Sequence, residues 1–183
     1  RSPSRGLGDV YKRQVICSNK DEEGRKSVFD FLPKNSRWVM VGRLDLNTSG
    51  LLLFTNNGDL ANKLMHPSSE VDREYAVRVL GKVEDQHINQ LTSGIELDDG
   101  FAKFHKVTFA GGDGANRWYH VVVREGRKRE VRRLWEALDF KVSRLIRIRF
   151  GEIRLPDNLR ANDSEYLKPK QVQSLLNSVK LKA

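Results

Sequence analysis

The sequence predicts an α+β fold with a mixed, mostly antiparallel central sheet that is flanked by helices. Short apolar runs typical of strands outnumber the segments with helical periodicity. At least two connections between strand candidates carry the turn residues of hairpins. Strands and helices do not alternate regularly along the chain, which argues against a doubly wound parallel fold.

Two buried strands are expected first, followed by a helix. Residues 38–42 and 51–55 are short apolar runs bounded by turn residues, as buried strands usually are. Asn57 or Asp59 can then cap a short helix, whose apolar residues lie on one face before Pro67 stops it.

The middle of the chain predicts more strands and one further helix. Residues 73–81 alternate between two faces as a strand does, and residues 83–94 have the pattern of a short helix ended by a glycine. An Asp-Gly pair within residues 95–112 predicts a hairpin. A glycine-rich loop over residues 111–116 then leads into a strand over residues 117–125.

Residues 125–138 predict a transition from strand to helix with two stripes. The apolar stripe has the i, i+3, i+4, i+7 spacing of a core face and consists of Val131, Leu134, Trp135 and Leu138. The opposite stripe is basic and consists of Arg129, Arg132 and Arg133, which by itself indicates a solvated face. Cations at a helix start oppose the helix dipole, and a nearby anion would relieve that conflict.

The remaining residues predict a long strand, a polar turn and a closing helix. Residues 142–156 form one β run in which Arg147 and Arg149 share a face with Leu145. Residues 164–179 have the pattern of a turn followed by a helix. A chain of 183 residues is long enough for one domain, or for one domain split into two lobes.

Composition narrows the class of protein. A hydrophobic fraction of 38% fits a globular protein, and no apolar run approaches the roughly 18 to 20 residues of a membrane span. The single Cys17 cannot form an internal disulfide, no Cys/His spacing indicates a metal site, and a reducing, cytoplasmic setting is expected. The net charge of +9 favours a polyanionic partner, because clustered Lys and Arg gain from the release of counterions bound to phosphates.

Residues 1–14 differ in composition from the rest of the chain. The stretch RSPSRGLGDVYKRQ lacks the apolar core of a secretory signal, and one back-translation of it resembles an adapter used in transposon-based sequencing libraries. We therefore interpret residues 1–14 as a non-native segment and residues 15–183 as the folded domain.

The polar turn VGRLDLNTSG places Asp45 beside an arginine at the edge of the core. An ionised acid is costly there unless it is paired or used, although an Asp in such a turn can also serve only to bond local backbone amides. Tyr75 can likewise be a cross-strand core aromatic. Nothing indicates a Ser/His/Asp triad, a phosphate-cradling glycine loop or a pair of carboxylates, so any chemistry has to use one acid, a tyrosine and arginines.

Four motifs in this order resemble those of pseudouridine synthases, in the branch that modifies ribosomal RNA. They read GRLDLNTSGLLLFTNNGDLANKLMHP, REYAVRVLG, EGRKREVRRLWEAL and SRLIRIRFGEIRLP, and the resemblance spans roughly residues 15–170. It implies the pseudouridine synthase catalytic fold for residues 15–183. It also implies that the first strand of the catalytic sheet and the family's small N-terminal RNA-binding domain are missing from this chain.

The same resemblance implies the reaction and the residues that carry it. Asp45 acts as a nucleophile toward a uridine, at the ribose or the base, so that the glycosidic bond breaks, the uracil turns, and carbon 5 bonds to the ribose. Arg132 pairs with this carboxylate, Tyr75 stacks on the flipped base and helps to remove the proton from carbon 5, and Leu145 forms an apolar wall. This isomerisation needs no metal, nucleotide or redox cofactor.

The implied partner is the ribosomal RNA of the large subunit (23S). The basic side chains expected to hold its phosphates are Arg43, Lys63, Arg127, Arg129 and Arg147. We expect a cytoplasmic monomer without membrane contact. Three alternatives remain open: another ribosomal RNA site, including one on the small subunit; a non-catalytic RNA-binding module in which Asp45 is structural; and a basic structural protein of the ribosome.

Overall fold

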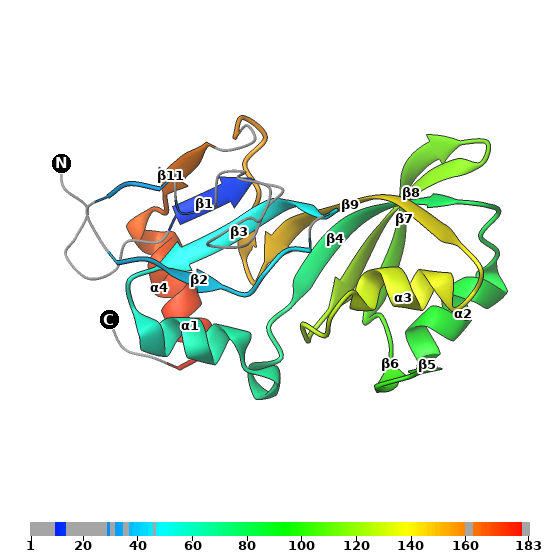
Figure 1. The fold of residues 1–183 in the computed structure, drawn as a ribbon, viewed down its shortest axis with the longest axis horizontal. Coiled ribbons are helices and arrows are strands. Elements are labelled where there is room, and N and C mark those ends of the chain that lie inside the picture. The colour runs from blue at the N-terminus through cyan, green and yellow to red at the C-terminus, as the bar shows by residue number, and fades with distance from the viewer. Residues whose placement is uncertain are drawn as a thin grey trace, which may run out of the picture.

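The chain folds around one mixed sheet of nine strands. The computed structural model describes residues 10–13, 29, 32–34, 37–45, 47–159 and 163–180. The strand order is β11-β1-β3-β9-β4-β8-β7, with β2 beside β3 and β10 beside β9 (Figure 1). β3 and β9 run parallel, and all other strand pairs in the described ranges are antiparallel. The predicted α+β class with a mixed, mostly antiparallel sheet is thereby confirmed.

The elements have the following bounds. The strands of the large sheet are β1 (Val10–Arg13), β2 (Val39–Val41), β3 (Ser49–Thr55), β4 (Arg73–Leu80), β7 (Lys106–Asp113), β8 (Asn116–Val123), β9 (Lys141–Phe150), β10 (Ile153–Arg154) and β11 (Ser164–Tyr166). A separate hairpin joins β5 (Ile95–Leu97) and β6 (Gly100–Ala102). The helices are α1 (Gly58–Met65), α2 (Asp85–Ser93), α3 (Glu130–Glu136) and α4 (Pro169–Ser178), with a 3-10 turn η2 (Pro67–Ser69) after α1.

Local sequence signals set several of these boundaries. α1 begins where the Asn57 side chain accepts a hydrogen bond from the Leu60 amide, at 3.1 Å between oxygen and nitrogen. Gly94 ends α2 with a positive φ of 120°, and its amide donates to the carbonyl of Gln90. The predicted hairpin at the Asp-Gly pair is the β5–β6 turn.

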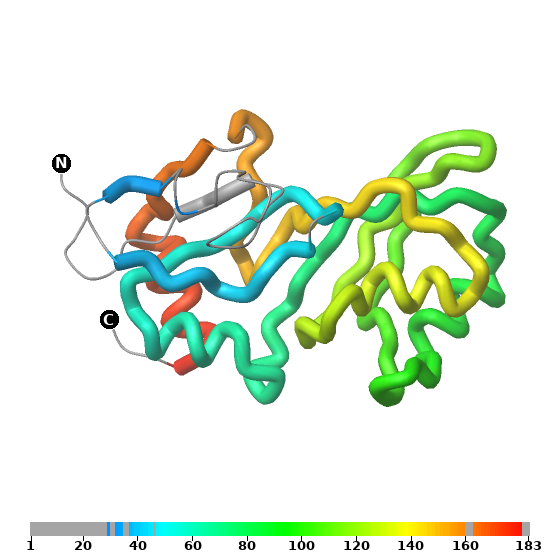
Figure 2. The backbone as a smooth tube through the Cα atoms, viewed as in Figure 1, coloured from blue at the N-terminus to red at the C-terminus, as the bar shows by residue number. Residues whose placement is uncertain are grey.

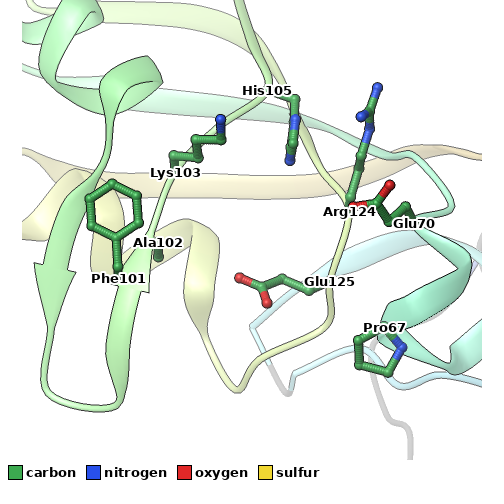
Figure 3. Close-up of a pocket in the computed structure, with 8 residues that line it drawn as sticks. All are labelled: Pro67, Glu70, Phe101, Ala102, Lys103, His105, Arg124 and Glu125. Atoms are coloured by element: carbon green, nitrogen blue, oxygen red, sulfur yellow. The ribbon is translucent and has the colours of Figure 1, made fainter.

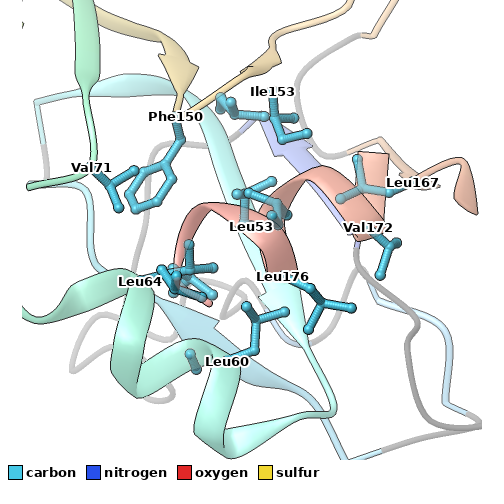
Figure 4. Packing of buried hydrophobic residues seen from close by; sticks show 14 of the residues in the cluster. Leu53, Leu60, Leu64, Val71, Phe150, Ile153, Leu167, Val172 and Leu176 are labelled. Carbon is cyan, nitrogen blue, oxygen red and sulfur yellow. The ribbon is translucent and has the colours of Figure 1, made fainter. Parts of the chain in front are cut away.

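Apolar side chains form a core at each end of the sheet. At one end α1 and α4 pack against β3, around Leu53, Leu60 and Phe150 (Figure 4). At the other end α2, α3 and the β5–β6 hairpin cover β4, β8 and β9, around the fully buried Trp135. A smaller cluster that includes Phe54 packs on the opposite face of β3. The long strands β4 and β9 connect the two lobes (Figure 2).

The lobes are joined where β3 runs alongside β9. Ser49 pairs with Ile146 and Gly50 pairs with Arg147. Gly50 has a φ of +111°, and a β-carbon added to it would lie 2.2 Å from the carbonyl oxygen of Arg147. Only a residue without a side chain fits this approach.

Five local predictions differ from the structure. Arg149 does not share the face of Arg147, because an irregularity in the β4–β9 pairing places Arg149 opposite Glu74 while Arg147 lies opposite Tyr75. Gly111 to Asp113 lie in β7 rather than in a loop, because they pair with β8. The predicted run over residues 142–156 is broken by a turn at Gly151, whose φ is +61°. The predicted turn at residues 164–166 is strand β11, and Leu138 lies beyond the end of α3.

β1 falls inside the segment that the sequence analysis interprets as non-native. Its residues 10–13 pair with both β3 and β11. Strand pairing uses backbone groups that every residue except proline carries in full. The pairing therefore has no bearing on the origin of residues 1–14, and that interpretation stays a prediction.

We expect the substitution Gly50→Ala to destabilise the fold by about 2–4 kcal/mol, because it adds backbone strain and a steric clash at the β3–β9 contact. Urea unfolding measures this. Gly58→Ala is the matched control, since a β-carbon at Gly58 meets nothing within 4 Å and Gly58 has no positive φ. Equal stability of Gly50→Ala and wild type would contradict the proposed constraint.

Candidate active site

The polar turn between β2 and β3 carries Asp45 at the joint of the two lobes. Leu44 is buried at 3% exposure and anchors the turn, while Asp45 is half-buried. The carbonyl of Asp45 accepts a hydrogen bond from the amide of Thr48, at 2.9 Å between nitrogen and oxygen. The turn is thus fixed at both ends by the core and closed by its own backbone, which leaves the Asp45 carboxylate at the edge of the core.

Arg132 reaches from α3 to this turn. Its Nη2 donates to the carbonyl of Asn47 at 2.8 Å, and its Nη1 donates to the carbonyl of Val142 at 3.3 Å. Arg132 is 7% exposed, so the prediction of a solvated arginine stripe on α3 is wrong for this residue. The spacing of arginines along α3 cannot reveal a hydrogen bond to a carbonyl that lies 85 positions earlier in the chain.

The surroundings of Arg132 shift the pKa of its guanidinium. Burial lowers the pKa of Arg132 below its usual value, and the neighbouring positive charge of Arg129 lowers it further. The negative charge of Asp45 acts in the opposite direction. The carboxylate of Asp45 is therefore near enough to favour the charged form of the Arg132 guanidinium.

Tyr75 and Leu145 lie on the two long strands beside the turn. Tyr75 of β4 is in register with Arg147 of β9, and Val77 is in register with Leu145. Directly paired residues of neighbouring strands project to the same face of a sheet. Tyr75 is half-buried and Leu145 is 5% exposed, so the two form one continuous wall with Arg147.

The predicted phosphate-binding residues separate into two groups. Arg43, Lys63 and Arg129 are exposed, and Arg129 has a positive φ of 54°, which is uncommon for a residue other than glycine. Arg127 is engaged by acids, since its Nη2 lies 2.7 Å from Glu125 Oε1. Arg147 is 2% exposed, and its side chain is therefore not accessible to a phosphate in this structure.

Arg73 is a buried arginine that the sequence analysis did not select. It is 5% exposed and donates to the carbonyls of Val71 and Leu64. Its guanidinium carbon lies 5.0 Å from the ring centroid of Phe150. The sequence could have indicated that Arg73 lies beside Tyr75, because the two are separated by one residue and strand alternation puts both on one face.

Glu130, at the start of α3, is the other buried ionisable group that the sequence did not reveal. It is 4% exposed, and its side chain hydrogen-bonds to the carboxylate of Glu125, to which a protonated Glu130 can donate. Burial raises the pKa of Glu130 to about 8, and the nearby Glu125 carboxylate adds to the rise. Glu130 is therefore mainly neutral at pH 7.

A groove of about 370 Å³ has Glu125, the neighbour of Glu130, in its lining (Figure 3). Its lining consists of Pro67, Glu70, Phe101, Ala102, Lys103, His105, Arg124 and Glu125. None of the predicted site residues lines it. Arg124 forms an ion pair with Asp72, at 2.8 Å between nitrogen and oxygen. Burial lowers the pKa of His105 and so favours its neutral form. Among the described residues that line the groove, Lys103 is then the one cation that is not offset, and the lining also contains the two acids Glu70 and Glu125. This charge balance does not favour a polyanion.

In the described part of the chain, no group of three or more His, Cys, Asp or Glu side chains is arranged to hold a metal ion. No helix there is long and apolar enough to cross a membrane.

Comparison with known proteins gives a consistent set of relatives. Residues 9–137 match the family described as RNA pseudouridylate synthase. The ribosomal large subunit pseudouridine synthase B of Yersinia pestis is 61% identical over 146 residues, which make up 79% of this chain and 46% of that protein. The protein of the same name from Haemophilus influenzae is 54% identical over 170 residues, or 92% of this chain and 48% of that protein. The chain spans about half the length of the curated relatives it matches.

Solved structures agree with the sequence relatives. The crystal structure of a pseudouridylate synthase superposes with a TM-score of 0.80 at 26% identity, over 93% of this chain and 74% of that one. The predicted family fold is thereby confirmed.

The buried Glu130 predicts a pH-dependent stability. Between the ordinary glutamate value of 4.5 and about 8, the folded chain holds a proton that the unfolded chain has lost. The free energy of unfolding should therefore fall as pH rises through this window. We expect Glu130→Gln, which stays neutral, to match wild type near pH 4.5 and to exceed it by on the order of 2 kcal/mol above pH 8.

Urea unfolding at several pH values tests this expectation. Glu136→Gln is the matched control, because Glu136 is exposed on the same helix, and it should keep the wild-type pH profile. An identical pH profile for Glu130→Gln and wild type would show that the Glu130 proton does not contribute to stability.

Proposed function

The chain belongs to the RNA pseudouridylate synthase family, and from that premise we propose that it isomerises a specific uridine of large-subunit (23S) ribosomal RNA to pseudouridine, with Asp45 as nucleophile. The observation that carries the proposal is the turn around Asp45, which Arg132 holds from α3 within the family-matched span. The names of the relatives support the large ribosomal subunit as the source of the substrate.

The Asp45 carboxylate supplies the electron pair that starts the reaction. It attacks the target uridine at the ribose or the base, and the bond between nitrogen 1 and the ribose breaks. The uracil turns, carbon 5 bonds to the ribose carbon, and the bond between Asp45 and the nucleotide breaks. Carbon 5 loses its proton, and nitrogen 1 takes up a proton in its place. No atom enters or leaves overall, so the reaction is an isomerisation.

Arg132 holds the backbone of the turn that carries the nucleophile. Its guanidinium donates to the carbonyl of Asn47, two residues beyond Asp45. This hydrogen bond fixes the turn without a bidentate pair between Arg132 and the Asp45 carboxylate. The positive charge still acts on Asp45 through a partly dry site, where electrostatic effects are stronger than in water.

Tyr75 and Leu145 form the pocket for the extruded base. The half-buried ring of Tyr75 offers a π face for stacking and a hydroxyl that can assist removal of the carbon 5 proton. Leu145 provides an apolar wall that separates the flipped base from water. Both strands that carry these residues are long and paired on both sides, which suits a pocket of fixed shape.

The exposed cations Arg43, Lys63 and Arg129 hold the RNA backbone in this proposal. A uridine outside its helix has to be fixed by its flanking phosphates. We further propose that the enzyme works as a monomer in the cytoplasm, without a metal or an organic cofactor.

The first test replaces Asp45. We expect Asp45→Ala and Asp45→Asn to lower the rate of pseudouridine formation by about 10³-fold or more, because neither side chain is a nucleophile. Chemical mapping of pseudouridine in unmodified large-subunit ribosomal RNA gives the rate and the modified position. Asp113→Asn, exposed on the β7–β8 hairpin, is the matched control and should keep the wild-type rate.

Two outcomes would count against the proposal. Unchanged modification by Asp45→Asn would remove Asp45 from the chemistry. Tight RNA binding without modification by any folded variant, wild type included, would favour a non-catalytic RNA-binding module.

The second test concerns the three exposed cations. We expect Arg43→Gln, Lys63→Gln and Arg129→Gln each to weaken RNA binding and to reduce the slope of log K against log salt by about 0.7 to 0.9, the effect of one lost phosphate contact. Lys141→Gln, exposed at the start of β9, serves as the control with an unchanged slope. Salt slopes identical to wild type in all variants would contradict the phosphate contacts.

A further inference from the structure

Arg147 is a buried cation without a neutralising partner in the described part of the chain. It is 2% exposed, and no carboxylate among the described residues lies within 4 Å of its guanidinium. Its Nη2 is buried without a hydrogen-bond partner there. A buried charge and an unsatisfied donor both cost folding free energy. Stability alone therefore does not account for an arginine at this position.

Two contacts of Arg147 lie on either side of the turn that carries Asp45. Its Nε donates to the carbonyl of Leu51, at 2.9 Å, on the strand that follows the turn. Directly after the strand that precedes the turn, a β-carbon added to Gly42 would lie 3.8 Å from Arg147 Nη1. Gly42 has a φ of +75°, so the backbone bends beside the guanidinium in a conformation that favours glycine.

The same side chain borders Tyr75. Arg147 and Tyr75 are directly paired across β9 and β4, and such pairs have β-carbons about 4.5–5.5 Å apart on one face of the sheet. The guanidinium carbon also lies 5.4 Å from the ring centroid of Phe150, over the ring. One rigid side chain thus touches both arms of the Asp45 turn and neighbours Tyr75.

We propose that Arg147 is a positioning residue that sets the distance and orientation between the Asp45 turn and Tyr75. This inference rests on the proposed function, and it replaces the phosphate contact that the sequence analysis predicted for Arg147. The planar guanidinium with several fixed donors can bind a carbonyl and pack on a ring at the same time, which an ammonium cannot do. Lysine should therefore fail as a substitute even though it keeps the charge.

The test compares Arg147→Lys and Arg147→Met with Arg144→Lys, an exposed arginine on the same strand. We expect both Arg147 variants to lower the single-turnover rate of pseudouridine formation at saturating RNA by about 100-fold, the effect of a displacement of about 1 Å at a reacting centre. The Kd for unmodified large-subunit ribosomal RNA should stay at the wild-type value. Arg144→Lys should match wild type in both quantities.

A second readout in the free protein does not depend on activity. The amide of Thr48 donates to the carbonyl of Asp45 and reports on closure of the turn. We expect it to exchange with solvent about tenfold faster in Arg147→Lys, while amides of α4 keep their wild-type rates. This measurement separates a failure of the positioning role from a failure of the proposed activity. If both Arg147 variants unfold, Gly42→Ala strains the backbone beside the same guanidinium, because Gly42 has a φ of +75°, and should accelerate Thr48 exchange likewise.

Three results would overturn the proposal. The first is an unchanged rate at saturating RNA in Arg147→Lys. The second is a weakened Kd with an unchanged saturating rate, which would restore the phosphate contact. The third is wild-type exchange of the Thr48 amide in the folded variants.

Discussion

The candidate site depends on arginines that bind backbone carbonyls instead of carboxylates. Arg132 holds the carbonyl of Asn47, and Arg147 holds the carbonyl of Leu51, so a polar turn is fixed from two different elements. A carbonyl accepts the hydrogen bond without cancelling the charge. Positive potential is therefore left over beside Asp45, where an ionised acid would otherwise be costly. Rigidity and electrostatic support come from the same two side chains.

This arrangement requires the parallel contact between β3 and β9. Arg147 can reach Leu51 only because Gly50 lets the two backbones approach, and the same contact joins the two lobes. β4 then brings Tyr75 into register with Arg147 on the other side of β9. The site is located where both lobes contribute strands, and a change at the joint affects fold and site together.

Sequence patterns predicted the elements well where local chemistry decides, as at the Asn57 cap, at Gly94 and at the β5–β6 turn. They failed where a distant partner decides. Arg132 belongs to a basic stripe by its spacing, yet a carbonyl contributed by the turn before β3 buries it. The burial of Glu130 and the pairing of residues 164–166 with β1 likewise depend on tertiary contacts. The grouping of Asp45, Tyr75 and Arg132 came from the order of motifs, since no local period links residues so far apart.

The distribution of unsatisfied polar atoms separates this site from an ordinary core edge. Among the described residues, buried side-chain atoms without a hydrogen-bond partner include Thr48 Oγ1, Arg132 Nε and Arg147 Nη2, which belong to the turn and to the two arginines that hold it. Each such atom costs about 1–3 kcal/mol, and leucine or methionine at these arginine positions would avoid that cost. Unsatisfied polar atoms on both arginines that hold one turn are typical of a site that trades stability for activity. The unpartnered Arg147 donor therefore supports a role for the turn beyond its structure.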